Sequence, residues 1–325
     1  MERRMALLPP MKRMMAMNEH ATSPKNAKKV KPHELPVDLR LEHIQRIFVK
    51  HDGIAHARKV LERTFKYGLR LREAQTGYII GHSRCGKSET VKRFIETKTG
   101  KRVQEKVFFQ LIEGNGIKIA YADLTNGATP LVASQMLLDE LFKDIKTKKL
   151  KEGQAAGRIV EQFLLHDVDM FIIDEAQQVF RGKVQGAEDK LAKLANWLLT
   201  LENSRSVRIL LVGAPELERL FHLVDPTNER KGAIAYLKPF AFQTADDKVE
   251  FASFVEAFVA DLPFASTCLT NKGRCDDEML HYLFYATRGR AGGFSKLIEA
   301  ATIEAFEDAR TKGCPEKLGG CPAIC

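Results

Sequence analysis

Apolar residues recur at helical spacing from Leu39 to Arg72, with a break near Asp52-Gly53. Residues three and four apart share one face of a helix, so this pattern predicts two amphipathic helices. Other apolar runs are short and nearly continuous, which is typical of strands buried on both faces of a parallel sheet. These runs are residues 78–80, 117–122, 169–174 and 207–212.

Segments with helical character separate these predicted strands. They cover about residues 89–98, 130–145, 155–166 and 187–202. Regular alternation of strands and helices predicts an α/β fold, with a parallel β-sheet flanked by helices. From about Asp246 to Ala309 the periodicity is helical throughout, which predicts a small C-terminal helical lid.

The ends of the chain differ in composition from this central part. Residues 1–33 carry eight Lys or Arg against two Glu and show no sustained period, which predicts a disordered tail. This tail has two possible roles. It is a basic arm that contacts nucleic acid or a protein partner, or it is a solvated segment without a binding role. The predicted divisions are a basic tail (1–36), an α/β domain with a helical lead-in (37–244), a helical lid (245–310) and a flexible Cys-containing tail (311–325).

Composition narrows the class of protein. The chain has 325 residues, 44% of them hydrophobic, which is enough for a sizeable core. Its apolar runs fall short of the roughly 20 residues that span a bilayer, and Arg and Pro interrupt the Met-rich start, so we expect a cytoplasmic protein with no membrane partner. The net charge of +9 fits a polyanionic partner or general solubility. The cysteines lack C-x-x-C spacing, which argues against a metal site built from cysteine ligands.

The segment from Gly81 to Ser88 fits the phosphate-loop pattern G-x-x-x-x-G-K-[ST], between a predicted strand and a predicted helix. Glycines let backbone N–H groups approach phosphate oxygens, Lys87 reaches the β- and γ-phosphates, and the Ser88 hydroxyl ligates Mg²⁺. The candidate nucleotide-binding residues are Gly81, His82, Ser83, Arg84, Cys85, Gly86, Lys87, Ser88 and Glu89.

The strand predicted at residues 169–174 ends in two acids, Asp174 and Glu175. Taken alone, these acids fit a core strand with a solvated end. Next to a phosphate loop, Asp174 is placed to hold Mg²⁺ through water and Glu175 to polarise the water that attacks the γ-phosphate. The two motifs together predict a site that binds a nucleotide with Mg²⁺, with Lys87 and Glu175 as catalytic residues.

This order of motifs resembles the AAA+ P-loop ATPases, and more narrowly the TniB/TnsC family of transposon ATPases and, more distantly, the target-selecting ATPase of phage Mu. The resemblance covers about Leu41 to Ala309. It rests on the phosphate loop, on Ile172–Gln177, on Leu211–Glu216 and on the short helical lid.

The resemblance implies further site residues. Arg230 corresponds to an arginine that is presented to a neighbouring subunit's nucleotide, with Lys231 as the substitute, and a loop arginine in water is the plain alternative. In the lid, Lys296 best matches the position that senses the nucleotide, and Arg290 comes next.

One position departs from the family pattern. The chain has Gly213-Ala214 where the superfamily places a Thr, Ser or Asn that helps to orient the attacking water. Hydrolysis is therefore slow, or another polar residue takes over that task. The candidates are Asn203, Ser204 and Glu216.

The implied function is ATP-dependent regulation of DNA transposition. Subunits would assemble on double-stranded DNA as a homo-oligomeric ring or helical filament, and would engage a transposase and a target-site selector protein. Candidate DNA contacts are Lys118, Thr125, Arg181 and Lys183. The alternatives are a replication initiator or helicase loader, and a nucleotide-gated protein adaptor that does not bind DNA.

Overall fold

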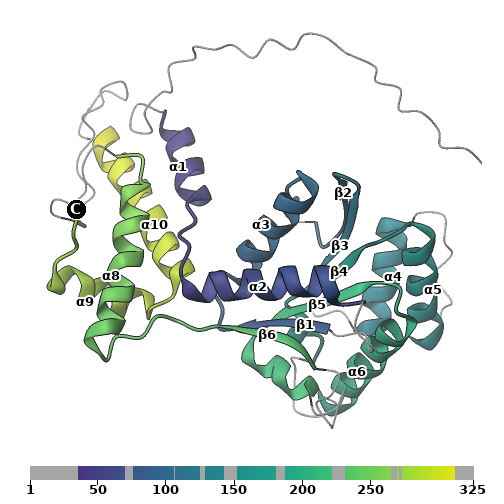
Figure 1. The fold of residues 1–325 in the computed structure, drawn as a ribbon. Helices are drawn as coiled ribbons and strands as arrows, with labels where there is room; N and C mark the ends of the chain where they lie inside the picture. The colour runs from purple at the N-terminus through teal and green to yellow at the C-terminus, as the bar shows by residue number, and fades with distance from the viewer. Residues whose placement is uncertain are drawn as a thin grey trace, which may run out of the picture.

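A computed structural model describes residues 36–69, 76–105, 107–124, 129–142, 152–180, 187–221, 231–264, 269–270 and 273–311. One six-stranded sheet forms the centre, with strand order β2-β3-β4-β5-β1-β6 (Figure 1). The strands are β1 (Thr76–Gly81), β2 (Phe109–Gly114), β3 (Ile117–Asp123), β4 (Met170–Asp174), β5 (Arg208–Gly213) and β6 (Lys231–Leu237).

The sheet is mixed, whereas the sequence predicted a parallel one. Strand β2 pairs antiparallel with β3, and every other pairing is parallel. Asn115 and Gly116 connect β2 to β3 with φ of 52° and 71°. A two-residue Asn-Gly loop with both φ values positive matches the right-handed twist of a hairpin, which explains the antiparallel edge.

Helices cover both faces of this sheet, and further helices form a lid at one end. They are α1 (Val37–Arg46), α2 (Asp52–Tyr67), α3 (Lys87–Thr99), α4 (Pro130–Leu141), α5 (Glu152–Leu165), α6 (Ala187–Ser204), α8 (Ala245–Ala260), α9 (Asp277–Thr287) and α10 (Ala291–Thr311), with short 3₁₀ helices η2 (Ala176–Phe180) and η3 (Pro215–Leu220). Every helix predicted from the sequence is present. The segment predicted as a helix to about residue 145 is helical only to Leu141, and residues 143–150 lie outside the described part.

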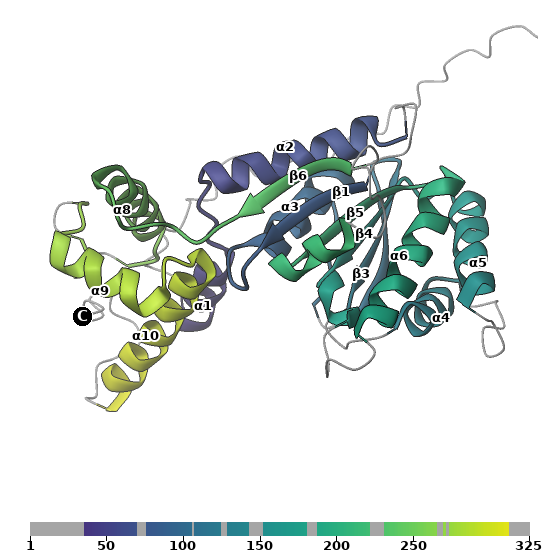
Figure 2. The ribbon, with the colours of Figure 1, turned by 90° about the horizontal axis from the view of Figure 1, so that it is seen from below.

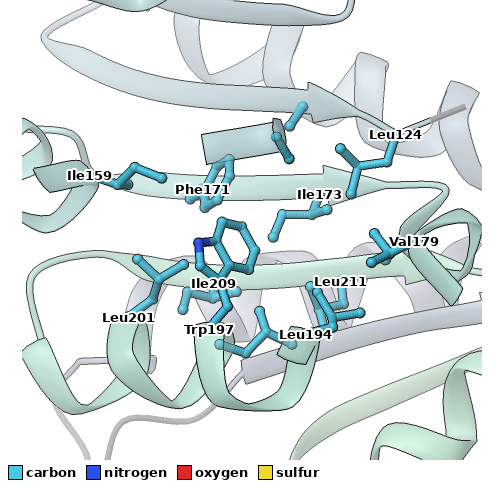
Figure 3. Close-up of a cluster of buried hydrophobic side chains, with 14 of the residues drawn as sticks. Leu124, Ile159, Phe171, Ile173, Val179, Leu194, Trp197, Leu201, Ile209 and Leu211 are labelled. Atoms are coloured by element: carbon cyan, nitrogen blue, oxygen red, sulfur yellow. The ribbon is translucent and has the colours of Figure 1, made fainter. Parts of the chain in front are cut away.

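The inner strands β1, β4 and β5 are buried on both faces, as their continuous apolar runs predicted. Phe171 and Ile173 of β4 face a core built with α4, α5 and α6, whereas Ile172 faces the core built with α2 and α3. On the first face Trp197 packs edge-on against Phe171, with ring centroids 6.1 Å apart (Figure 3). Each such buried side chain stabilises the fold by roughly 1.5–3 kcal/mol. This core fixes the sheet whose strand ends carry the candidate site.

A third core joins the lid helices α8, α9 and α10 to α1. Ile44 of α1 is fully buried in this cluster together with Phe251 and Phe294. Figure 2 shows α1 beside α10, at the opposite end of the molecule from α4–α6. The helical lead-in therefore packs partly with the lid, although the predicted division joined all of it to the α/β domain. The boundary near residue 244 stays a prediction. No helix in the described part of the chain combines the length and apolarity needed to cross a bilayer.

Candidate active site

The loop between β1 and α3 has the backbone shape of a phosphate cradle. Gly86 (φ 88°) and Arg84 (φ 66°) both adopt left-handed conformations, which glycine reaches at no steric cost and other residues rarely adopt. Glycine is also required at Gly81, because a Cβ there would lie 2.2 Å from the carbonyl oxygen of Leu237 in β6. The loop is therefore held closely against the neighbouring strand.

Lys87 opens α3 and is buried, and its Nζ donates to the carbonyl oxygen of His82 at 3.0 Å. Thr90 anchors the same turn by donating to the carbonyl oxygen of Gly86 at 2.7 Å. The first N–H groups of a helix have no partner within the helix and carry partial positive charge, so this helix start favours an anion. Lysine and helix start together are suited to phosphate.

Asp174 ends β4 with only 1% of its surface exposed. The Tyr121 hydroxyl donates to its Oδ2 at 3.0 Å, and the N–H of Glu175 donates to its Oδ1 at 2.9 Å. Burial raises the pKa of Asp174, and its side-chain hydrogen bond with Ser88 opposes that rise. A cation beside this carboxylate would offset the cost of burying its charge.

Magnesium fits this donor set. Asp174 and Ser88 provide a carboxylate and a hydroxyl side by side, which are the oxygen ligands that Mg²⁺ takes together with water and phosphate. In the described ranges no group of three or more His, Cys, Asp and Glu side chains could hold a metal by itself. An ion at this site would therefore take part of its coordination from a nucleotide.

Glu175 follows Asp174 and turns the chain out of the sheet. Its φ of 53° is uncommon for a residue with a side chain, and its carbonyl oxygen accepts from the N–H of Gln178 at 2.9 Å. The Glu175 carboxylate accepts from Nε2 of Gln177 at 2.6 Å. This turn brings the half-buried Glu175 to the same cavity that His82, Ser83 and Lys87 of the phosphate loop line.

A cavity of about 490 Å³ unites these elements. Its volume lies in the range of small-molecule sites, about 300–1,000 Å³. The lining residues come from the phosphate loop, the end of β4, the end of β5 and the lid. They are His82, Ser83, Lys87, Glu175, Gln177, Gln178, Ala214, Pro215, Glu216 and Arg290. Of the three stand-ins proposed for the missing polar residue at Gly213-Ala214, Glu216 lines the cavity, whereas Asn203 and Ser204 do not.

The structure brings Arg290 of the lid to the cavity, and its buried Nε has no hydrogen-bond partner among the described residues. Lys296 lies further along α10, is exposed, and is not among the lining residues. Position therefore favours Arg290, the second choice from the sequence, over Lys296. The chain turns at Arg288 and Gly289 (φ 54° and 65°), and α10 begins at Ala291. The role of either cation remains a prediction.

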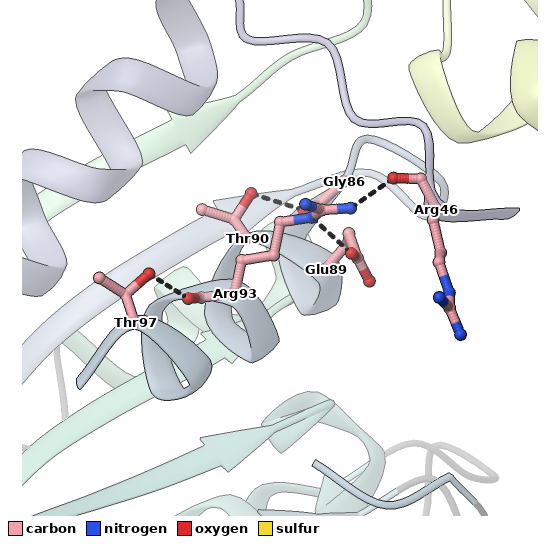
Figure 4. Close-up of polar contacts among 6 residues, drawn as sticks. All are labelled: Arg46, Gly86, Glu89, Thr90, Arg93 and Thr97. Carbon is pink, nitrogen blue, oxygen red and sulfur yellow. Dashed lines mark hydrogen bonds and ion pairs between the residues drawn. The ribbon is translucent and has the colours of Figure 1, made fainter. Parts of the chain in front are cut away.

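Glu89, a predicted nucleotide-binding residue, points to Arg93 of the same helix (Figure 4). Its Oε1 accepts from Nε of Arg93 at 2.6 Å, and Nη2 of Arg93 donates to the carbonyl oxygen of Arg46 at 2.7 Å. Glu89 is not among the residues that line the cavity. These contacts tie α3 to the end of α1, so Glu89 supports the position of the phosphate-loop helix.

Of the predicted DNA contacts and the predicted intersubunit arginine, the structure describes only Lys118. Lys118 lies near the start of β3, the end of the strand opposite Asp174, and its Nζ donates to the carbonyl oxygen of His166 at 2.9 Å. Part of its hydrogen-bonding capacity is thus used within the protein. The other predicted contacts, Thr125, Arg181, Lys183 and Arg230, lie outside the described residues. So do four of the six cysteines, Cys268, Cys314, Cys321 and Cys325.

Sequence reasoning assigned no role to Gln177, although it lies within the stretch that carried the resemblance. Gln177 is 1% exposed, and its Oε1 accepts from the N–H of Ala214 at 2.9 Å. Its side chain therefore joins the end of β5 to Glu175. The position of Gln177 two residues after the acid was the available signal, but a sequence cannot tell on which side of the turn the amide lies.

Comparison with known proteins agrees with this geometry. The family model of an AAA domain matches residues 70–221. Among solved structures, the ORC1 protein of Aeropyrum pernix in complex with DNA is similar at a TM-score of 0.54 and 14% identity, over 86% of this chain and 66% of that one. Cdc6p from Pyrobaculum aerophilum is similar at 0.50 and 12% identity, over 84% and 66%.

The chain therefore spans slightly less than two thirds of either structure. A comparison with curated proteins found no match. At these identities the similarity concerns the fold, which is that of an AAA+ P-loop ATPase. The expected fold class is confirmed, apart from the antiparallel strand at the edge of the sheet.

Proposed function

We propose that this protein binds and hydrolyses ATP, and that ATP drives it to assemble on double-stranded DNA as a regulator of transposition. The single observation that carries the ATPase part is the cavity in which Lys87, Glu175 and Arg290 converge from three separate elements. The transposition role rests on the resemblance of the motifs to the TniB/TnsC family.

The proposed chemistry uses groups that the fold already orients. Backbone N–H groups of the loop and Lys87 bind the β- and γ-phosphates, and Ser88 and Asp174 hold magnesium. When bound, magnesium neutralises phosphate charge and polarises the γ-phosphoryl group. Glu175 orients and polarises a water molecule for attack on the γ-phosphorus. The bond to the ADP oxygen breaks as the bond to water forms, the proton of the water passes to Glu175, and ADP and phosphate are released.

The lid gives ATP a means to change the shape of the protein. Arg290 immediately precedes α10 and lines the same cavity as Lys87. Its charge would attract the phosphates and hold the lid over them, whereas release of the γ-phosphate would weaken that contact. Lid closure would then set the angle at which subunits meet, and Arg230 of one subunit would reach the nucleotide of the next.

A replication initiator is the second candidate, since the ORC1 protein with a similar fold was solved in complex with DNA. Both roles require DNA binding, but they differ in what is recognised. A transposition regulator that marks targets broadly would contact phosphates and have slight sequence preference. An initiator would prefer one motif. A protein adaptor would show no DNA binding that depends on salt.

A DNA-binding assay with and without a non-hydrolysable ATP analogue tests these alternatives, on random duplexes and over a salt series. We expect binding only with the analogue, and a loss of affinity of about 10³-fold or more between about 50 mM and about 200 mM salt. Matched random duplexes should bind alike. Tight binding to one motif regardless of nucleotide would support the initiator role, and absence of DNA binding at low salt would support the adaptor.

A further inference from the structure

The Gln177 side chain connects the turn after β4 to the residue that follows β5, through the two ends of its single amide group. Its Nε2 donates to Oε2 of Glu175 at 2.6 Å, and its Oε1 accepts from the backbone N–H of Ala214 at 2.9 Å. The side chain is almost completely buried. An amide has one donating and one accepting end, so these two partners determine its orientation.

The space around Gly213 is shaped to admit this amide. A Cβ at Gly213 would lie 2.5 Å from Oε1 of Gln177 and 3.1 Å from Cδ2 of Leu217. The φ of Gly213 is not in the left-handed region, so the backbone there does not itself demand glycine. Glycine is needed because the Gln177 amide fills the place of a side chain.

We propose that Gln177 is the positioning residue that holds the Glu175 carboxylate for water attack, in place of the polar side chain that is missing at the end of β5. This inference rests on the proposed ATP hydrolysis and extends it. The amide transmits the position of Ala214 to the acid, because both contacts belong to one planar group. A shift of β5 or η3 would therefore move the carboxylate.

The contact matters because Glu175 has few other restraints. Its second amide neighbour, Gln178, reaches the same Oε2 only at 3.5 Å. Without Gln177 the carboxylate can rotate away from the water, and a displacement of about 1 Å at a reacting group can cost about 100-fold in rate. Nucleotide affinity depends instead on the phosphate loop, Lys87 and Arg290, none of which bonds to Gln177 in the described contacts.

The test compares Gln177→Met with wild type in steady-state ATPase assays and in direct ATP binding. Methionine keeps the length of the side chain but can neither donate to Glu175 nor accept well from Ala214. We expect kcat to fall by about 10-fold to 100-fold while the Kd for ATP changes by less than about threefold. Gln162→Met, in α5 and outside the cavity lining, makes the same exchange and is expected to leave both values unchanged.

A double-mutant cycle asks whether Gln177 acts through Glu175. In the Glu175→Gln background, Gln177→Met should cause no further loss of kcat, since the group it positions is already gone. Independent and additive losses would show that Gln177 acts in another way, and would overturn the inference.

Gly213→Ala supplies a second approach that leaves Gln177 in place. The added methyl would displace the amide and lower kcat, but it should cost nothing more when Gln177→Ala has already vacated the space. If Gln177→Met fails to fold, this pair carries the test. An unchanged kcat in Gly213→Ala would then overturn the inference.

These outcomes separate the inference from the proposed function. Wild-type hydrolysis that needs Glu175 but is indifferent to Gln177→Met would overturn the positioning role alone. Absence of hydrolysis in the wild-type oligomer on DNA would overturn the proposed ATPase and the positioning role with it. A parallel rise in the Kd for ATP and fall in kcat would indicate a general packing role and also overturn the inference.

Discussion

The backbone N–H of Gly292 in the lid donates to the carbonyl oxygen of Arg84 in the phosphate loop at 2.8 Å. A Cβ at Gly292 would lie 3.0 Å from the same oxygen, so the approach of the two backbones requires a small residue. The first turn of α10 thereby finds a partner for one of its free N–H groups. This contact places Arg290, two residues earlier, over the cavity.

We therefore expect Gly292→Val to push the lid away from the phosphate loop. Arg290 would move with it, and ATP affinity should fall by about 10-fold, the equivalent of about 1.4 kcal/mol. Titration of a fluorescent ATP analogue measures this. Gly157→Ala in α5 is the control, because a Cβ there meets nothing within 4 Å. Equal ATP affinity in Gly292→Val and wild type would show that the lid contact does not support binding.

A second prediction separates nucleotide binding from hydrolysis. Lys87→Ala removes the cation aimed at the phosphates and should abolish ATP binding. Glu175→Gln removes the group that polarises water, so kcat should fall by about 100-fold or more while ATP remains bound. Binding and phosphate-release assays on both variants make the comparison. Equal loss of affinity would show that Asp174 and Glu175 are not the hydrolytic pair.

The parts of the site that the sequence predicted are those where spacing along the chain fixes the geometry. The phosphate loop Gly81–Ser88 is a local structure, because its shape depends on a turn within the segment itself. Asp174 lies near this loop because the C-terminal ends of parallel strands meet at one edge of the sheet. The Gln177 bridge escaped prediction because it depends on the turn at Glu175. An amide's partners across such a turn are a property of tertiary packing.

Strands β2 and β6 were not predicted from the sequence, for two different reasons. β2 was signalled by Asn115-Gly116 between two apolar runs, a hairpin signature in a stretch to which the sequence analysis assigned no element. β6 contains small residues and one exposed tyrosine, Tyr236, so it gives little of the apolar signal of a buried strand. It forms because β1 offers it a parallel partner, which only the folded sheet provides.

A third prediction distinguishes the two lid cations. Arg290→Ala should lower ATP affinity by about 10-fold, since a charge-assisted contact to phosphate is worth roughly 1.5–3 kcal/mol. Lys296→Ala should have a much smaller effect, because Lys296 is exposed and does not line the cavity. Side-by-side ATP titrations decide between them. A larger loss in Lys296→Ala would restore the order that the sequence suggested.

The fourth prediction concerns Arg230, which lies outside the described residues. If it reaches a neighbour's γ-phosphate, Arg230→Ala should leave ATP affinity of the monomer nearly intact while it impairs ATP-dependent assembly and hydrolysis. The loss in hydrolysis should be about 10³-fold or more, as for arginine fingers in other nucleotide hydrolases. Sedimentation and phosphate release on DNA measure the two effects.

Mixing of variants shows whether Arg230 acts across a subunit boundary. Arg230→Ala subunits keep Lys87 and Glu175, whereas Glu175→Gln subunits lack the catalytic acid but carry the arginine. Where the two kinds alternate, an intact active site meets an intact Arg230, so the mixture should hydrolyse ATP although each variant alone is inactive. Co-assembly on DNA without any recovered hydrolysis would mean that Arg230 serves its own subunit or has no part in catalysis.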